Sequence, residues 1–104
     1  MSCFAYDLMG GVVHNPSKDE MQSLLSSVGA ADAEHPDVSL NTEEGWSLSY
    51  SKAKNIAFEN VETGEGPWHM KNIQIDQALS LWLLLSSDHI EDVKSKPWVE
   101  GYAV

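Results

Sequence analysis

The sequence contains no arginine, and its six lysines stand against sixteen aspartates and glutamates, which gives a formal net charge of −10. Arginine is the usual residue for paired hydrogen bonding to phosphate. Nucleic acids, anionic membranes and phosphorylated ligands therefore match this composition poorly as partners. A basic protein is a better match, because opposite charges speed encounter. Plain solubility is the other interpretation of the charge, and the composition leaves both open.

Long hydrophobic runs and paired cysteines are missing too. The most apolar segment, IDQALSLWLLLSS, is interrupted by polar residues and falls short of the roughly 18 apolar residues that cross a membrane. The N-terminus, MSCFAYDLMGG, lacks the basic start and long apolar segment of a secretory signal. The single cysteine, Cys3, cannot form an internal disulfide, which fits a reducing compartment. Together these absences predict a cytoplasmic protein.

Signatures of metal binding and catalysis are scarce. The sequence has no H-x-x-x-H pair among its four histidines, no second cysteine and no EF-hand spacing, so we expect no metal and no cofactor. It has no G-x-S-x-G elbow, and its TGEG segment lacks the G-K-[ST] ending of a phosphate loop. Cys3 alternates within a predicted strand, which favours a structural role. We therefore predict a binding protein and not an enzyme, although carboxylate pairs that form only in space stay open.

Alternating apolar residues predict the strands of one modest core, since 104 residues with 42% hydrophobic content suit a single domain. The predicted strands cover residues 3–8, 37–41, 45–51 and 55–62, with a hairpin turn at TEEG. In this register one face is large and apolar and carries Val38, Leu40, Trp46, Leu48, Tyr50, Ile56 and Phe58. The other face is small and polar and carries Ser39, Ser47, Ser49, Ala57 and Glu59. An antiparallel sheet covered by helices on one side produces this contrast.

Three segments have helical patterns. The first has a capping box, Ser17 with Glu20, and an apolar stripe that ends near Gly29. The second, residues 74–86, is apolar on almost every side, which is typical of a buried helix. The third has capping-box spacing from Asp88 and ends before Pro97. We therefore expect a single α+β domain over residues 1–104, with a small antiparallel sheet of about four strands and two to three helices packed mainly on one face.

The stretch ENVETGEGPWHM, residues 59–70, raises the main functional question. Its glycines permit unusual backbone angles, its proline limits the entropy lost on binding, and Glu62 and Glu65 supply charge. We interpret it as an acidic recognition loop in which Trp68 and His69 supply contact area. A structural connection from sheet to helix, with Trp68 tucked beneath it, is the alternative. Trp98 likewise follows a proline, and each of the two tryptophans is either a plug at the core edge or an exposed anchor.

The order of these segments resembles the small immunity proteins of bacterial polymorphic-toxin systems, including contact-dependent inhibition and Rhs systems. The resemblance covers most of the chain and is carried by Asn15-Pro16-Ser17, Gly45-Trp46, the Leu79–Trp82 pair and Pro97-Trp98. It implies an inhibitor that binds one cognate toxin domain and protects the producing cell. It implies no catalytic residues.

Many such toxins are nucleases with basic clefts, which an acidic protein suits. We therefore predict non-covalent blocking of the toxin's active or substrate-binding surface, through the partner-binding residues Asp32, Glu34, Asp37, Glu43, Glu44, Glu59, Glu62, Glu65, Trp68 and His69. One alternative is a small hydrolase or isomerase, which a pocket lined by His69 or Cys3 with a carboxylate would favour. The other is a nucleic-acid mimic, which carboxylates spaced like phosphates along one face would favour.

Overall fold

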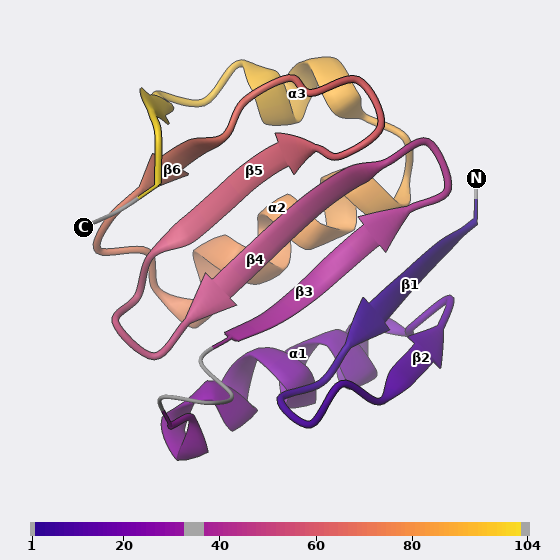
Figure 1. Cartoon of the computed structure of the whole chain (residues 1–104). Helices are drawn as coiled ribbons and strands as arrows, with labels where there is room; N and C mark the ends of the chain where they lie inside the picture. Colours follow the sequence, from indigo (N-terminus) through magenta and orange to yellow (C-terminus); the bar gives the residue numbers. More distant parts are fainter. Residues whose placement is uncertain (1, 33–36, 103–104) are drawn as a thin grey trace.

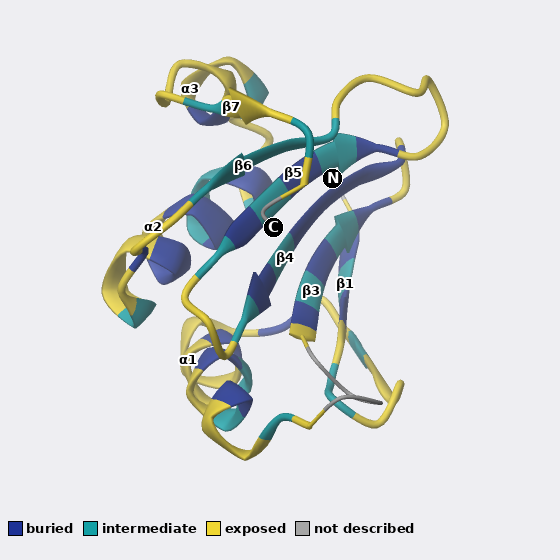
Figure 2. Cartoon of the chain, turned by 60° about the vertical axis from the view of Figure 1, so that its left-hand side comes forward, coloured by how far each residue is buried: buried dark blue, intermediate teal, exposed yellow. Residues whose placement is uncertain are grey.

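The computed structural model describes residues 2–32 and 37–102, which form one antiparallel sheet with helices on one side (Figure 1). The sheet has seven strands in the order β2-β1-β3-β4-β5-β6-β7. The strands are β1 (Cys3–Tyr6), β2 (Val12–His14), β3 (Asp37–Thr42), β4 (Trp46–Ser51), β5 (Ile56–Asn60), β6 (Trp68–Met70) and β7 (Val99–Glu100). The helices are α1 (Lys18–Ser26), a short 3-10 segment η1 (Ser27–Ala30), α2 (Ile75–Ser86) and α3 (Ile90–Lys94). Figure 2 shows the helices together on one side of the sheet.

The predicted α+β class with an antiparallel sheet is confirmed, but the prediction of about four strands is wrong. The three additional strands, β2, β6 and β7, are only two or three residues long. Strands this short cannot show the alternation by which a sequence predicts a strand. Because the edge strands β2 and β7 are short, they also leave few unpaired backbone groups to which another chain could bind.

The register confirms the predicted apolar face. Leu40 pairs with Leu48 and Leu48 with Phe58, and all three side chains are fully buried. Helix α2 packs on this face, and its Trp82 is fully buried with the indole N–H donating to the Leu48 carbonyl at 3.2 Å. The polar side chains therefore lie on the opposite face of the sheet.

The predicted start of α1, both ends of α2 and the end of α3 before Pro97 are confirmed, and two other predicted helix ends are wrong. Ser17 and Glu20 form the expected capping box at the start of α1. Gly29 does not end the helix directly, because η1 continues the chain to Ala30. Asp88 does not cap α3, because its φ is 62° and the residue before the helix is His89, which makes no side-chain cap. None of the helices among the described residues is long and apolar enough to cross a membrane.

A buried phenol predicts how stability responds to alkali. The Tyr50 hydroxyl donates to the Ile73 carbonyl at 2.6 Å, and desolvation, together with the negative charge of Asp76, raises the pKa of Tyr50. The unfolded phenol ionises near pH ~10, so the stability that Tyr50 provides is complete below that pH and is lost as the pH rises further. Tyr50→Phe should lower the free energy of unfolding by about 1 kcal/mol at pH 8. Urea unfolding at rising pH should show this deficit shrinking above pH ~10; a constant deficit would contradict the assignment.

Candidate functional site

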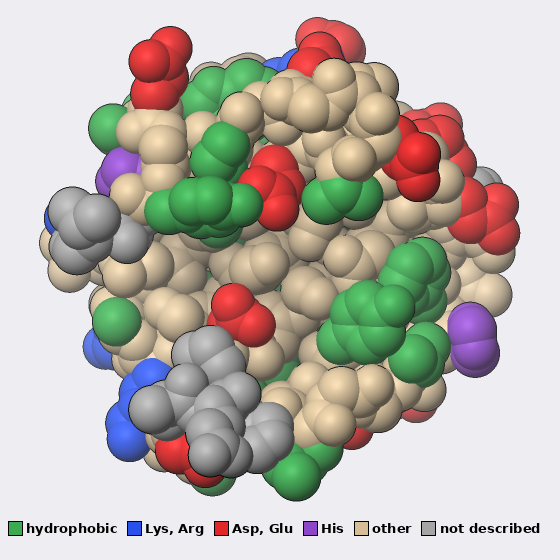
Figure 3. Space-filling model, viewed as in Figure 1, with side chains coloured by type: hydrophobic (Ala, Val, Ile, Leu, Met, Phe, Trp, Pro, Cys, Tyr) green, Lys and Arg blue, Asp and Glu red, His purple; other side chains and the backbone are tan. Residues whose placement is uncertain are grey.

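Four exposed glutamates gather at one end of the sheet, where the β3–β4 turn lies beside the β5–β6 loop. The Val61 N–H donates to the Gly45 carbonyl at 2.9 Å, which ties the two loops together. We call Glu43, Glu44, Glu62 and Glu65 the acidic end. In Figure 3 carboxylates stand along the upper right margin, where these two loops lie in Figure 1. The fold thus brings together four of the predicted partner-binding residues from separate parts of the sequence.

Asn60 is the residue that fixes the acidic end. Its side-chain carbonyl accepts from the N–H groups of Glu62 (2.9 Å) and Thr63 (3.0 Å), and its amide donates to the Glu44 carbonyl (3.1 Å). Asn60 is 3% exposed, so one buried side chain bonds to both loops in addition to the Val61–Gly45 backbone bond. Gly45 allows the close approach, because a Cβ there would clash with the Glu62 Cγ, and its φ of +96° also favours glycine. Sequence reasoning missed Asn60, although asparagine at a strand end before a loop commonly bonds the backbone two residues on.

Trp68 begins strand β6, so residues 68–70 are not part of a loop as predicted. Its ring is half-buried and lies 5.7 Å from the ring of Phe58, which also contacts Trp46 and Trp98. Trp98 is half-buried as well, and its indole N–H donates to the Val93 carbonyl at 2.8 Å. Both tryptophans therefore belong to one aromatic cluster at the margin of the core. This arrangement favours the alternative in which each closes the core edge.

Glu59 and His69 lie on the polar face of the sheet and not in the two loops of the acidic end. His69 pairs with Ala57, and its Nδ1 lies 2.7 Å from the Gly101 carbonyl, to which the ring N–H donates. The Tyr102 hydroxyl donates to the half-buried Glu59 carboxylate, and this hydrogen bond is the main cause that raises the pKa of Tyr102. The C-terminal segment thus contacts two predicted partner-binding residues.

The remaining predicted residues lie elsewhere. Asp37 begins β3 opposite Ser51, at the end of the sheet remote from the β3–β4 turn. Much of Asp37 is in solvent, yet desolvation of its carboxyl group raises its pKa. Asp32 is exposed, and Glu34 lies outside the described residues. The predicted set therefore divides between the acidic end, the polar sheet face and the segment before β3.

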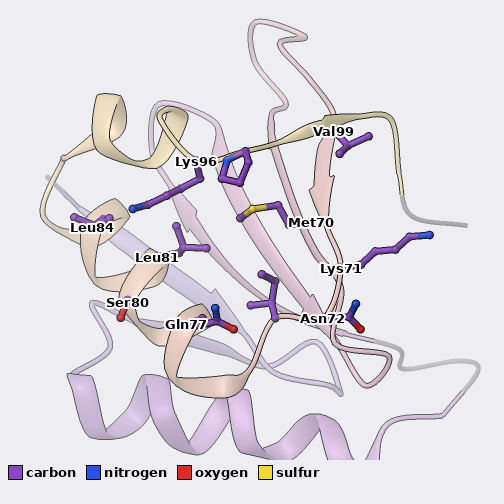
Figure 4. Close-up of a pocket in the computed structure, with 11 residues that line it drawn as sticks. Met70, Lys71, Asn72, Gln77, Ser80, Leu81, Leu84, Lys96 and Val99 are labelled. Carbon is purple, nitrogen blue, oxygen red and sulfur yellow. The ribbon is translucent and has the colours of Figure 1, made fainter.

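A groove of about 560 Å³ opens between α2, the end of β6 and the chain from Lys96 to Val99 (Figure 4). Its lining is mostly apolar, with Met70 and Leu81 facing the space between the elements. The Lys96 side chain extends toward Leu84, while Lys71 points away from the groove. Neither His69, Cys3 nor any carboxylate lines it. The groove thus lacks the groups that the hydrolase or isomerase alternative requires.

Cys3 also has the wrong surroundings for a nucleophile. Its side chain is 6% exposed in the core, and burial raises the pKa of the thiol. Reactive cysteines have a lowered pKa, because the thiolate is the nucleophile. Within residues 2–32 and 37–102, no three histidine, cysteine or acidic side chains are placed to share a metal ion.

Comparison of the chain with protein-family models, curated proteins and solved structures finds no match. The resemblance to immunity proteins stays a prediction.

Proposed function

We propose that this protein is an immunity-type inhibitor that binds one cognate toxin domain, a basic nuclease, and blocks its active or substrate-binding surface without covalent chemistry. The observation that supports the proposal most is the acidic end. Four exposed carboxylates stand there on two loops held together by the Asn60 amide. A cleft that binds nucleic acid presents cations to phosphates, and the same cations would pair with these carboxylates.

Hydrogen bonds order the two loops, so the acidic end is a defined surface and not only a result of the acidic composition. Binding by a flexible acidic tail loses free energy when the tail becomes ordered. Here the hydrogen bonds of Asn60 and the Val61–Gly45 bond already fix the backbone that carries the charges. The net charge of −10 adds a field that steers a basic partner toward the protein. Fast encounter and pre-ordered contacts both suit an inhibitor of an incoming toxin.

The nucleic-acid mimic is less well supported. Such a mimic needs a row of carboxylates along one face at the spacing of phosphates. On β3, β4 and β5 the polar face carries Asp37 and Glu59, and serine, asparagine and alanine occupy the positions between them. The acidic end is a cluster and not a row.

The function is tested with a candidate toxin domain, a basic nuclease domain sought among the genes that flank this one. Cells that express this domain should survive when they also produce the protein, and the two chains should copurify. Cells that produce the domain with an unrelated acidic protein of similar size provide the control. Death of the cells despite ample soluble protein, with no copurification, would contradict the proposal.

Charge reversal at the acidic end should weaken the inhibitor. Glu62→Lys with Glu65→Lys should lower affinity for the toxin domain about tenfold or more, because two attractive pairs become repulsive. Both residues are exposed, so the melting temperature should stay close to that of the wild type. Calorimetric affinity and thermal melting on the same samples give the two quantities.

The matched control reverses two exposed carboxylates on α3, Glu91→Lys with Asp92→Lys. Both double variants change the net charge from −10 to −6, since each replacement adds two charges. An equal loss of affinity in both would mean that only the overall field matters. If neither double variant loses affinity, the negative charge serves solubility alone.

A further inference from the structure

One whole face of the sheet is free of helices among the described residues. The view of Figure 3 looks onto this face, with the helices behind it as in Figure 1. The register places Ser39 beside Ser49 and Ser49 beside Ala57, with Asn41 and Ser47 in the neighbouring row. We call these five residues of β3, β4 and β5 the centre of the open face. Figure 3 shows a broad, mainly tan area on this face, with acidic side chains within it and hydrophobic side chains on both sides of it.

The side chains at this centre are small, and Ser47 is buried while the other four are half-buried. None of the six lysines lies in any of the seven strands, and this face has only serine, asparagine and alanine at its centre. Short side chains let another protein approach the strands closely. They also lose little rotamer freedom when they become buried. The centre is therefore suited to contact with another protein, a property that solubility alone does not require.

Aromatic side chains stand at the margins of the centre. On β1, Phe4 and Tyr6 form an edge-to-face pair with ring centroids 5.5 Å apart, and Tyr6 is 41% exposed. At the opposite margin Tyr102 is 59% exposed and is hydrogen-bonded to Glu59. Rigid tyrosines beside serine and asparagine are the composition that antibodies use to bind proteins. This composition points to protein recognition independently of the charge.

The charge of the open face indicates which kind of partner would bind there. Glu59 lies on it one residue before Asn60, and Asp37 lies on it at the far end of β3. The desolvated carboxyl of Asp37 would gain from a cation brought close to it. With acids at both ends and no lysine in the strands, the face is complementary to a basic surface.

We infer that the open face is the main docking surface for the toxin domain, and that it receives a protruding basic segment of that domain between the aromatic margins. The acidic end then lies at the rim of the interface and guides the approach. The inference rests on the proposed function, because the toxin domain is the partner it names.

A pair of matched variants tests the inference. Ser49→Arg places a long cation in the centre of the open face, whereas Ser23→Arg makes the same change on an exposed position of α1, on the other side of the sheet. Both variants change the net charge equally. Ser49→Arg should lower affinity for the toxin domain by roughly 100-fold or more, as blocking the centre of an interface does, and Ser23→Arg should change it by less than about threefold.

A second measurement on the wild-type protein covers the case in which Ser49→Arg does not fold. With a deuterated, alanine-methyl-labelled sample, saturation of the toxin domain should transfer to the Ala57 methyl on the open face. It should not reach the fully buried methyl of Ala78 on α2. Binding with equal affinity in both arginine variants, or with no transfer to Ala57, would overturn the inference and leave the proposed function standing. If the wild-type protein does not bind the toxin domain, both are overturned.

Discussion

Replacing Trp68 with alanine should lower the free energy of unfolding by about 2 kcal/mol, roughly half of what a fully buried tryptophan contributes. The ring is half-buried and packs on Phe58, with 5.7 Å between the ring centroids. It also packs so closely on Gly66 that a Cβ on that residue would contact it. For a domain of this size the loss corresponds to a fall in melting temperature of about 10 °C. Thermal and urea unfolding of the isolated protein measure it without any partner.

The same variant distinguishes the two roles that the sequence allowed for Trp68. If the ring closes the core edge, stability falls, and affinity for the toxin domain falls only as far as β6 is disturbed. Tyr102→Ala is the control for the melting temperature alone, because Tyr102 is a mainly exposed aromatic whose removal should shift that temperature by less than about 2 °C. Its affinity is not compared, because Tyr102 stands at a margin of the open face. An unchanged melting temperature in Trp68→Ala together with a large loss of affinity would restore the role of an exposed anchor.

The central part of the fold was predictable because its side chains alternate over long enough strands. Strands β3, β4 and β5 have five or six residues each, and their large residues face the helices as expected. Trp46 is buried in the core, as its place on the predicted apolar face requires. What the sequence could not show was the extent of the sheet. Strand β6 has three residues in a stretch rich in glycine and polar residues, and the contacts that make it a strand come from Ile56, Ala57 and Phe58 on β5.

The candidate site was predictable as a composition but not as an arrangement. The sequence indicates Glu43, Glu44, Glu62 and Glu65 as candidate contacts, yet nothing in the local pattern places the first pair beside the second. Their proximity depends on the pairing of β4 with β5 and on one buried amide. Asp37 and Glu59 share a face with the small residues of the sheet only because strand alternation is combined with the register. Local sequence determines which side chains are available, and long-range pairing determines which of them form one surface.

Replacing Asn60 with alanine should lower the free energy of unfolding by about 3 kcal/mol, because three hydrogen bonds are lost and each contributes on the order of 1 kcal/mol. The effect should be concentrated at the acidic end. The N–H groups of Glu62 and Thr63 would lose their acceptor, and the Glu44 carbonyl would lose its donor. Amide hydrogen exchange of residues 61–65 should therefore accelerate more than that of β3. Urea unfolding and exchange on the same sample provide both quantities.

Asn41→Ala is the matched control, because it removes the same atoms from a strand position that is only half-buried. The Asn41 amide donates to Ser39 at 3.0 Å and to the Phe4 carbonyl at 3.5 Å, and joins no loops, so we expect a loss below about 1 kcal/mol. If Asn60→Ala were as mild as Asn41→Ala, the two loops would be held by their backbone contacts alone. If Asn60→Ala instead loosens the loops while the sheet persists, affinity for the toxin domain should fall although no carboxylate has been removed. That result would show that the order of the acidic end contributes to binding in addition to its charge.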